Sequence, residues 1–545
     1  MPSGRYSSIA HAGRRFAASL LERRRWPWLA FTLVTLLAIV HVGWICDDAF
    51  ISARVVDNFL SLRGLRWNPA ERVQAFTHPL WLLLMILARF VVHDAYWSLL
   101  GLSVLVSALC VGTIASTCDR SEPFFALVAG TLALSKSFVD FSSSGLENPL
   151  THLLVVLLWR EVRKPSPSLL QASVWVGLAT LNRPDLILLF APPLWVLIQA
   201  QPSRWSTQLR TVLAAFSPLL AWELFSLVYY GSFVPNTAIA KLGVALPRAV
   251  LIEHGFAYLV QPIFNDPISL LLLLTGLPLG LLRGARPLRA LCAGAALYIV
   301  YVVSIGGDFM AGRFLSASVV VAVLALLELM PVPRATFQAA LVVVALLLEA
   351  VSPTAIWTAR LPHSASTEPE TFKATCVDGV CDERAFYGPF TQWRNVINAQ
   401  VRPPHPWALL GASWSKTPKR TRVSGAIGFR GFFAGPDVFV VDYHALSDPL
   451  VARLVHNPKL HDWRPGHFKR CVPLGYPEAT QVGPAALADA PLRPYYQKIW
   501  LVTRGRLWSA ERFRAIWQLN TSAARFTGPY TCRPPSLTTE PGPMP

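Results

Sequence analysis

Two adjacent carboxylates, Asp47 and Asp48, directly follow an apolar run from Trp26 to Ile45. A polar loop rich in Arg, Asp, Asn and aromatic residues then continues to Pro79. Acids at the mouth of a membrane helix are costly unless they face water or a partner, so they are candidate functional residues. The alternative is a pair of solvated acids that only marks a helix end. As a functional pair, they could take a proton from an acceptor hydroxyl.

Five further polar segments lie at the ends of apolar runs and carry other candidate site residues. They are Gln74-Ala-Phe-Thr-His78-Pro79, Ser144-Gly-Leu-Glu147-Asn-Pro149, Leu181-Asn-Arg183-Pro-Asp185, Tyr229-Tyr-Gly-Ser-Phe-Val-Pro235-Asn236 through Lys241, and Gly306-Gly-Asp308-Phe-Met-Ala-Gly-Arg313. Arg313, through its planar fork, and Lys241, as a point charge, are suited to a phosphate. Gly306-Gly307 could be only a helix-ending turn. Such a turn would nonetheless present Asp308 and Arg313 to one cleft.

Three of these motifs also have a structural interpretation. Glu147 could simply cap the following helix, since acids favour helix N-termini. Arg183 and Asp185 could form a salt bridge across the proline between them. His78 could be a hydrogen-bond donor at a helix start.

The composition indicates an integral membrane protein. Of the 545 residues, 53% are hydrophobic and 15% are charged, and the mean hydropathy is +0.42; this balance is typical of membrane chains. The net charge of +18 could suggest nucleic acid. The basic residues, however, stand in short blocks between apolar runs, as the positive-inside rule predicts. We therefore expect a lipid bilayer, and no nucleic acid, as a partner.

Residues 1–26 form a basic segment that we expect to remain in the cytoplasm. The next apolar run lacks a small-residue cleavage site, so it is predicted to be an uncleaved first helix rather than a signal peptide. A transmembrane domain at 27–352 is predicted to hold about eleven helices. Their ranges are 27–45, 97–117, 123–141, 150–163, 169–181, 186–200, 211–229, 268–282, 290–305, 314–332 and 335–352.

A further apolar run, Leu80 to Val92, is short and bracketed by Pro79 and by charged residues. If it crossed the membrane, every later loop would change side. As a helix on the outer surface, it leaves the basic loop clusters inside. This topology places the polar motifs on the outer face, with a first outer loop at 46–96. It predicts a multi-pass protein of the inner (plasma) membrane with an extracytoplasmic cleft.

The region 353–530 is predicted to be a periplasmic, extracytoplasmic domain of mixed α/β structure. It is rich in aromatic residues and contains a strand-like run from Asp437 to Asp442. Residues 531–545, rich in Pro, Ser and Thr, are predicted to be disordered.

Four cysteines follow residue 352, in a compartment that should be oxidising: Cys376, Cys381, Cys471 and Cys532. Two disulfides are expected, and of the three possible pairings we favour 376–381 with 471–532. Zinc is the alternative, but no CxxC pair or flanking histidine spacing supports it.

The sequence contains no H-E-x-x-H or EF-hand motif, no P-loop and no G-x-G-x-x-G after a strand. The motifs needed for nucleotide-dependent chemistry in the cytoplasm are therefore missing, and no metal site is predicted. The motifs fit chemistry on a donor that is already in the membrane. An outer-face carboxylate would take a proton from an acceptor, and cations beside it would hold a lipid phosphate as it leaves.

Over most of the chain, and in the same order, these motifs resemble the GT-C membrane glycosyltransferases, which use polyprenyl-phosphate sugars. They resemble most closely the AftB family of terminal arabinofuranosyltransferases, to which the flagellar motor control protein ZomB is related. The matching pieces are Asp47-Asp48 with the Asn58…Gly64…Asn68-Pro-x-Glu71-Arg72-Val73 loop, Ser144-Gly-Leu-Glu147, Arg183-Pro184, Tyr229-Tyr-Gly…Val-Pro235…Thr237-Ala…Ala-Lys241, Gly306-Gly-Asp308-Phe-Met-x-Gly-Arg313, and Asp442-x-x-Ala-Leu446-x-Asp448-Pro449-Leu450. One departure is Ala445, where the family often has Gly.

The resemblance implies a GT-C fold and a polyprenyl-phospho-arabinose-like donor, with no certain cofactor. It does not give the acceptor, because the C-terminal region diverges from the family; we expect a glycan or glycoprotein. The resemblance also implies that Asp47 is the leading catalytic carboxylate, with Asp48 close behind. Arg183, Lys241 and Arg313 would serve the donor phosphate or the electrostatics of the cleft. The residues expected to orient sugar or acceptor are His78, Glu147, Asp185, Asn236, Asp308, Asp442 and His444.

The main hypothesis is thus a polyprenyl-phosphate-sugar-dependent glycosyltransferase, with arabinofuranosyl transfer outside the cytoplasm. One rival is a non-enzymatic membrane scaffold or flagellar motor control protein on the same fold. Another is a transporter or flippase, which would need a charged path through both faces, whereas the inner turns hold Arg clusters but few acids. Stereochemistry stays open, because one base suffices for inversion and retention needs a nucleophile or another route.

Overall fold

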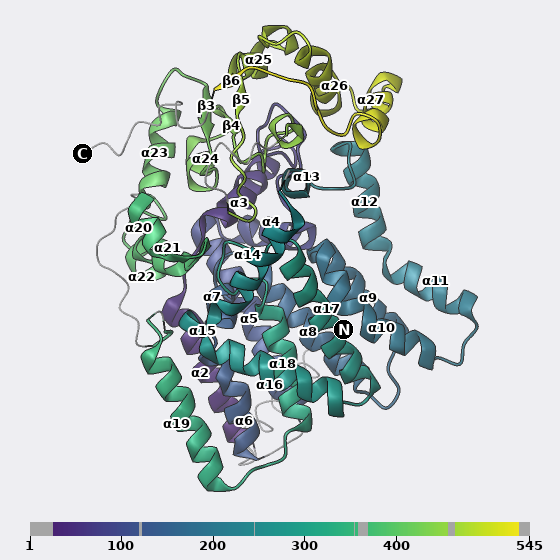
Figure 1. Ribbon diagram of the computed structural model, residues 1–545, viewed down its shortest axis with the longest axis vertical. Coiled ribbons are helices and arrows are strands. Elements are labelled where there is room, and N and C mark those ends of the chain that lie inside the picture. The colour runs from purple at the N-terminus through teal and green to yellow at the C-terminus, as the bar shows by residue number, and fades with distance from the viewer. Residues whose placement is uncertain are drawn as a thin grey trace, which may run out of the picture.

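The computed structural model describes residues 25–118, 122–242, 244, 246–353, 355–357, 369–455 and 464–533. This part of the chain is mostly helical, and its strands form three two-stranded pairs. A bundle of helices occupies the lower part of Figure 1, and the segments after residue 369 lie above and beside it. The predicted cytoplasmic segment up to residue 24 and the tail from residue 534 lie outside the described residues.

The bundle is built from apolar helices that match the predicted runs. They are α2 (Trp26–Val42), α5 (Ala95–Thr117), α8 (Asn148–Val162), α9 (Leu169–Asn182), α10 (Ile187–Ala200), α16 (Pro267–Arg283), α17 (Arg286–Ser304), α18 (Ser316–Leu329) and α19 (Ala335–Val351). α18 is buried along its whole face from Ser316 to Leu327. A helix that is apolar all round belongs at the centre of a bundle, and α18 packs against α16, α17 and α8.

Within the described ranges, two helices, α5 and α17, are long and apolar enough to cross a membrane singly. The number rises to five if each of three bent helix pairs counts as one span. Six shorter apolar helices accompany them. The structure supports a chain rich in apolar helices, and the count of eleven spans stays a prediction.

Two predicted spans are broken. The run 123–141 divides into α6 (Pro123–Gly130), the 3₁₀ turn η2 (Thr131–Ala133) and α7 (Lys136–Phe141). The run 211–229 becomes α11 (Trp205–Ala215) and α12 (Ser217–Tyr229), bent by 58°. Pro218 is the second residue of α12, which fits a break there because proline starts a helix more readily than it continues one.

Two further helices, α14 (Arg248–Val260) and α15 (Pro262–Asn265), precede α16 and were not predicted. α14 carries Arg248, Glu253 and His254, so its sequence does not read as an apolar run. Together α14 and α15 are bent by 115° from α16.

The stretch after Ile45 was expected to be a loop, but its first 14 residues form helix α3 (Asp47–Leu60). α3 is bent by 86° from α2, so it turns away from the direction of that span. It packs against α24 (Phe429–Ala434), where Phe50 contacts the rings of Phe429 and Phe432. The short apolar run 80–92 is observed as helix α4 (Pro79–Val91), and its location at the outer surface stays a prediction.

The remaining helices and 3₁₀ turns lie between the bundle helices or follow α19 in the chain. They are η3 (Pro184–Leu186), α13 (Asn236–Leu242), α20 (Pro369–Ala374), α21 (Glu383–Thr391), α22 (Trp393–Val396), α23 (Pro406–Ser415), η4 (Val451–Arg453), α25 (Tyr476–Val482), η5 (Pro484–Ala486), α26 (Leu492–Arg504) and α27 (Ala510–Asn520). The predicted strand-like run is observed as β4 (Phe439–Asp442), which pairs in parallel with β3 (Thr421–Ser424).

The region after residue 369 divides between two hydrophobic cores. Phe386, Trp414 and Phe429 join the core of the helix bundle. The segments of α25, α26 and α27 surround a second core, which also includes Ala240 of α13. The first half of this region is therefore packed into the bundle rather than held apart from it.

Both predicted disulfides are confirmed, Cys376–Cys381 and Cys471–Cys532. The first closes the hairpin of β1 (Cys376–Val377) and β2 (Val380–Cys381). The second joins segments that also pair as β5 (Val472–Pro473) and β6 (Cys532–Arg533). Regular structure thus extends to Arg533, the third residue of the predicted tail.

Candidate active site

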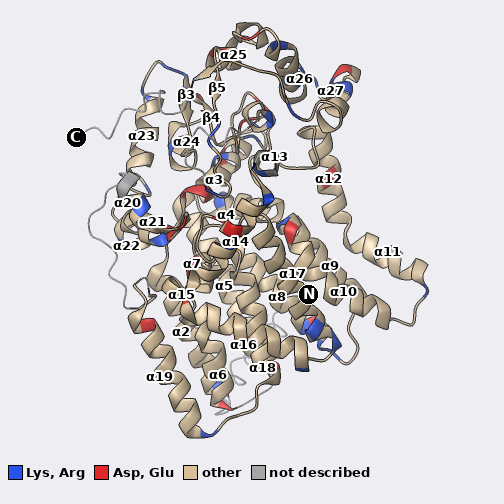
Figure 2. Ribbon diagram, in the orientation of Figure 1, with Lys and Arg blue, Asp and Glu red and all other residues tan. Residues whose placement is uncertain are grey.

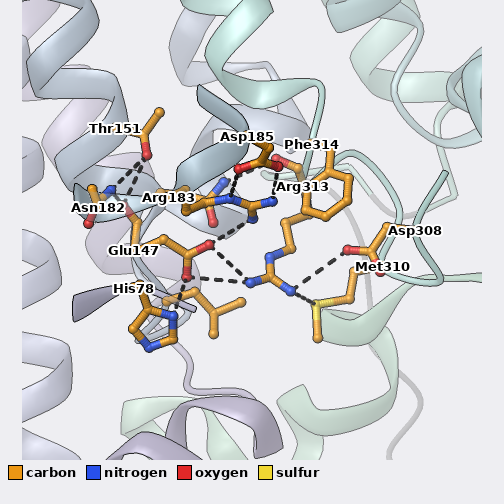
Figure 3. Close-up of polar contacts among 12 residues, drawn as sticks. His78, Glu147, Thr151, Asn182, Arg183, Asp185, Asp308, Met310, Arg313 and Phe314 are labelled. Carbon is orange, nitrogen blue, oxygen red and sulfur yellow. Dashed lines mark hydrogen bonds and ion pairs between the residues drawn. The ribbon is translucent and has the colours of Figure 1, made fainter. Parts of the chain in front are cut away.

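The charged residues of the long bundle helices are few, and many lie where the bundle meets the later segments (Figure 2). Glu147, at the N-cap position of α8, is fully buried. Its side chain makes no capping hydrogen bond. Its Oε1 instead accepts hydrogen bonds from Arg183 Nη1 at 2.9 Å and from Arg313 Nη2 at 3.1 Å. The carboxylate therefore serves as the shared counter-ion of two arginines (Figure 3).

Each arginine has a second acid. Arg183 Nε donates to Asp185 Oδ1 at 3.0 Å, so the salt bridge across the proline is confirmed. Arg313 Nη1 lies 3.7 Å from Asp308 Oδ2. The two guanidinium groups thus face three carboxylates. Arg183 and Arg313 are already paired before any phosphate arrives.

His78 completes this cluster from the start of α4. Its Nδ1 lies 3.5 Å from Glu147 Oε2, and its Nε2 makes a 2.8 Å hydrogen bond with Ser52 Oγ. Its side chain gives no cap to α4. Burial lowers the pKa of His78 to about 4 against the opposing charge of Glu147. Burial raises the pKa of Glu147, but Arg313, His78 and Arg183 together bring it well below its usual range.

The chain reaches this cluster through glycine turns. Gly306 and Gly307 follow α17 with φ of 93° and 72°, a conformation that L side chains rarely adopt. A Cβ at Gly307 would lie 2.5 Å from Cβ of Tyr258. The turn is therefore the helix end that the glycines suggested, and it also brings Asp308 and Arg313 to Glu147.

Asp47, the first residue of α3, is buried and uses both oxygens. Oδ1 accepts a 2.7 Å hydrogen bond from the amide of Phe429, and Oδ2 accepts one at 3.1 Å from Gly428. Burial raises the pKa of Asp47 to about 7, although the two amide hydrogen bonds oppose the shift. Its carboxyl group therefore holds the start of α24 in place.

Asp48 is only partly buried, and in the described chain it has no hydrogen bond or ion pair. Both acids line a cavity of about 160 Å³ between α3 and the later segments. Since Asp47 is occupied by two amides, Asp48 is the carboxylate of the pair that is open to a ligand.

Lys241, near the end of α13, lies beside this cavity. Its side chain is exposed, and the charges of Asp308 and Asp48 both act on it. A Cβ at Gly466 would lie 3.1 Å from Lys241 Nζ, so the ammonium group reaches the segment that lines the cavity. Unlike Arg183 and Arg313, Lys241 is not neutralised by a direct salt bridge in the described residues.

Two other predicted residues, Asn236 and Asp442, make hydrogen bonds that hold the later segments. Asn236 donates to the carbonyl oxygens of Ala445, Leu446 and Asp448 at 2.9 to 3.1 Å. Asp442 is fully buried and accepts from the amides of His444 and Ser447.

His444 lines the cavity and makes a 3.1 Å hydrogen bond with the carbonyl oxygen of Gly425. Ala445 has a φ of 66°, which explains why a glycine would suit this position.

The cavity is also lined by residues that do not belong to the sequence motifs. They are Glu383, Tyr387, Trp407, Arg430, Tyr443, Arg464 and His467. One signal was present in the sequence: Cys381-Asp382-Glu383 repeats the Cys-acid-acid order of Cys46-Asp47-Asp48. In both cases the acids stand at the start of a helix.

The chain is similar to two curated proteins, while no family model matches it. The terminal beta-(1->2)-arabinofuranosyltransferase of Mycobacterium tuberculosis is 26% identical over 82% of this chain and 84% of the relative. The protein of the same name from Corynebacterium glutamicum is 30% identical over 50% of this chain and 46% of the relative. The resemblance to AftB-like glycosyltransferases is confirmed, and so is the prediction of a glycosyltransferase enzyme. With the apolar helices, it supports a membrane protein.

Proposed function

We propose that the chain transfers a pentose, most simply an arabinofuranosyl residue, from a polyprenyl-phosphate donor to a glycan or glycoprotein outside the cytoplasm. The single observation that carries this proposal is the open carboxylate of Asp48 in a cavity beside Lys241. The pentose is inferred from the names of the two relatives.

Asp48 is the catalytic carboxylate in this proposal, and Asp47 positions it by fixing α3 to α24. In a single displacement, the acceptor oxygen bonds to the anomeric carbon, its proton passes to Asp48, and the bond from that carbon to the phosphate oxygen breaks. In a double displacement, Asp48 first forms a glycosyl ester, which the acceptor then attacks. The anomeric configuration of donor and product, measured by NMR, distinguishes the two routes.

The leaving polyprenyl phosphate takes the electron pair of the broken bond. Lys241 stabilises its charge directly, since it has no salt bridge of its own in the described residues. Arg183 and Arg313 are held by Glu147, Asp185 and Asp308, so they supply a fixed positive field beside the site. Lys241→Ala should therefore weaken donor use more than Lys241→Arg does.

The test uses purified full-length protein with a radiolabelled polyprenyl-phospho-arabinose and a short arabinofuranosyl oligosaccharide. Wild-type protein should transfer label to the oligosaccharide, and Asp48→Asn should lower the rate by about 100-fold or more, as expected for the loss of a catalytic acid–base group. Asp57→Asn, on the exposed side of the same helix, should leave the rate unchanged. Failure of wild-type protein to label the oligosaccharide, or full activity of Asp48→Asn, contradicts the proposal.

We also infer that the N-terminus is cytoplasmic and that the region from 353 to 530 is extracytoplasmic. The two disulfides of the later segments support this orientation, because disulfides persist in oxidising compartments. Reporter proteins that are active only outside the cytoplasm should be active when fused after residue 350 and inactive when fused after residue 26. The reverse pattern would overturn the orientation.

A further inference from the structure

A third carboxyl group, that of Glu383, faces the cavity of Asp47 and Asp48. Glu383 is the first residue of α21 and comes from the later segments rather than from the bundle. It is 4% exposed, and its Oε1 accepts no hydrogen bond from any residue that the structure describes. An unpaired buried polar atom is unfavourable unless something outside the chain satisfies it.

The neighbours of Glu383 on both sides are fixed elsewhere. Asp382 caps α21 by accepting from the amide of Ala385 at 2.9 Å, and it lies 3.1 Å from Lys136 Nζ. Arg384 Nε lies 2.7 Å from Asp140 Oδ1. Both of these ion pairs connect α21 to α7. Glu383 alone, between two anchored residues, is left directed into the cavity.

The disulfide hairpin before α21 ties it to the glycine loop of the site. The amide of Cys381 donates to the carbonyl oxygen of Phe309 at 2.6 Å, and the amide of Ala311 donates to that of Cys381 at 3.0 Å. These bonds connect the start of α21 to the loop that carries Asp308 and Arg313. Glu383 therefore has a fixed position relative to that loop.

Burial, together with the neighbouring acids, favours a protonated Glu383. Burial raises its pKa well above the usual range; Arg464 opposes this shift, and the negative charges of Asp48, Asp308 and Asp47 reinforce it. The other titratable groups on the cavity are Tyr387, Arg430, Tyr443, His444 and His467, and Cys46 lies near Glu383. A protonated carboxyl group can donate a hydrogen bond through its O–H, whereas an ionised one can only accept.

The remaining walls suit a carbohydrate. Tyr387, Trp407 and Tyr443 line the same cavity. Aromatic rings with polar edges combine an apolar face with a hydrogen-bonding group, which matches a sugar ring. These rings and Glu383 all come from the segments after residue 369, whereas Lys241 and the arginine cluster come from the segments before it. These walls are the ones left for the acceptor if the donor phosphate lies at those cations.

We propose that Glu383 binds a hydroxyl group of the acceptor sugar and places that sugar against the aromatic wall for attack. This inference rests on the proposed glycosyl transfer. It makes Glu383 a positioning residue for the acceptor, supplied by the later segments to a site whose catalytic acid comes from α3.

The experiment measures KM for acceptor and donor separately, with kcat, in wild-type protein, Glu383→Gln and Glu383→Ala. Glu383→Ala should raise the acceptor KM about tenfold, the value of one hydrogen bond of about 1.4 kcal/mol, and should leave the donor KM within twofold. Glu383→Gln keeps a neutral donor and should restore most of the affinity. Glu511→Ala, an exposed acid in the first turn of α27, is the matched control.

The pH profile gives a second readout. In wild-type protein the acceptor KM should rise at alkaline pH as Glu383 loses its proton, and in Glu383→Gln that rise should disappear. An unchanged acceptor KM in Glu383→Ala overturns the inference. So does an equal effect on donor and acceptor KM, or a pH profile that the glutamine variant shares with wild-type protein.

Calorimetric binding of the arabinofuranosyl oligosaccharide separates this inference from the proposed function. If wild-type protein and Asp48→Asn bind the sugar and Glu383→Ala binds it about tenfold more weakly, while no protein transfers label, the acceptor site stands and the proposed reaction falls. If transfer depends on Asp48 but Glu383→Ala binds sugar as wild-type protein does, the reaction stands and the acceptor site falls.

Discussion

The carboxylate of Asp47 accepts a 2.7 Å hydrogen bond from the backbone amide of Phe429, 382 positions further along the chain. Each residue is the first of its helix, α3 and α24. From the same side of α3, Arg54 donates to the carbonyl oxygens of Gly431 and Val438. Asp47 of α3 therefore accepts from amides at the start of α24, while Arg54 donates to one carbonyl within α24 and to another beyond its end. This helix connects the bundle to the later segments.

Loss of the Asp47 carboxylate should destabilise the protein more than loss of its neighbour. Asp47→Ala leaves two buried amides without acceptors, at a cost of about 1–3 kcal/mol each. Asp48→Ala removes no hydrogen bond that the structure describes and should change stability by less than about 0.5 kcal/mol. Thermal unfolding in detergent should show a lowered midpoint for Asp47→Ala alone. Asp47→Asn, which keeps one acceptor oxygen, should fall between them; equal midpoints would contradict the assignment.

Removal of Glu147 should be among the most destabilising single changes in the chain. Glu147→Ala leaves Arg183 and Arg313 buried with one acid fewer, and breaking a buried ion pair costs about 3–5 kcal/mol. The matched control is Asp57→Ala, which breaks the more exposed pair with Arg89 and should cost about 0–1 kcal/mol. Thermal unfolding midpoints of the two variants give the comparison. A Glu147→Ala protein as stable as Asp57→Ala would show that the cluster is held by other contacts.

Asp442 should make stability depend on pH in an unusual direction. Burial raises its pKa from 3.8 to about 7, although backbone amides oppose the shift. Between these values the folded chain keeps a proton that the unfolded chain has lost, so this contribution is complete below pH 3.8 and disappears as pH rises through 7. Its upper limit is about 4 kcal/mol.

The measurement is the unfolding midpoint of wild-type protein and Asp442→Asn between pH 4.5 and 8. Asparagine does not titrate, so the difference between the two proteins isolates Asp442 from the other acids. Wild-type protein should lose stability relative to the variant as pH rises. A difference that stays constant with pH would mean that Asp442 is ionised throughout.

The sequence predicted the helical membrane-protein class and much of the cluster around Glu147, because both depend on local patterns. Apolar runs become helices wherever they occur, and Glu147, Arg183 and Arg313 stand at the ends of such runs. Their shared location on the outer face was predicted from the clusters of basic residues in alternate loops. In the structure, Glu147 contacts both arginines.

The different roles of Asp47 and Asp48 could not be predicted from the sequence. Their distinction depends on Gly428 and Phe429, which lie far along the chain and have no motif. The same holds for Glu383, whose direction into the cavity is set by the anchoring of Asp382 and Arg384 to α7. Helix α3 was missed because its polar residues, which contact α24, hid its helical pattern.

The two disulfides should differ in what they protect. Cys471–Cys532 joins residues 61 apart, so the chain-entropy estimate gives it about 4 kcal/mol, against about 2 kcal/mol for Cys376–Cys381 with a separation of 5. Replacing both cysteines of a pair by serine avoids a leftover thiol. The 471/532 double variant should lower the unfolding midpoint more.

The 376/381 double variant should mainly raise the acceptor KM, because its hairpin connects Glu383 to the loop of Asp308 and Arg313. If the short disulfide instead proves the greater loss in stability, with acceptor KM unchanged, then the hairpin supports the fold and not the acceptor site.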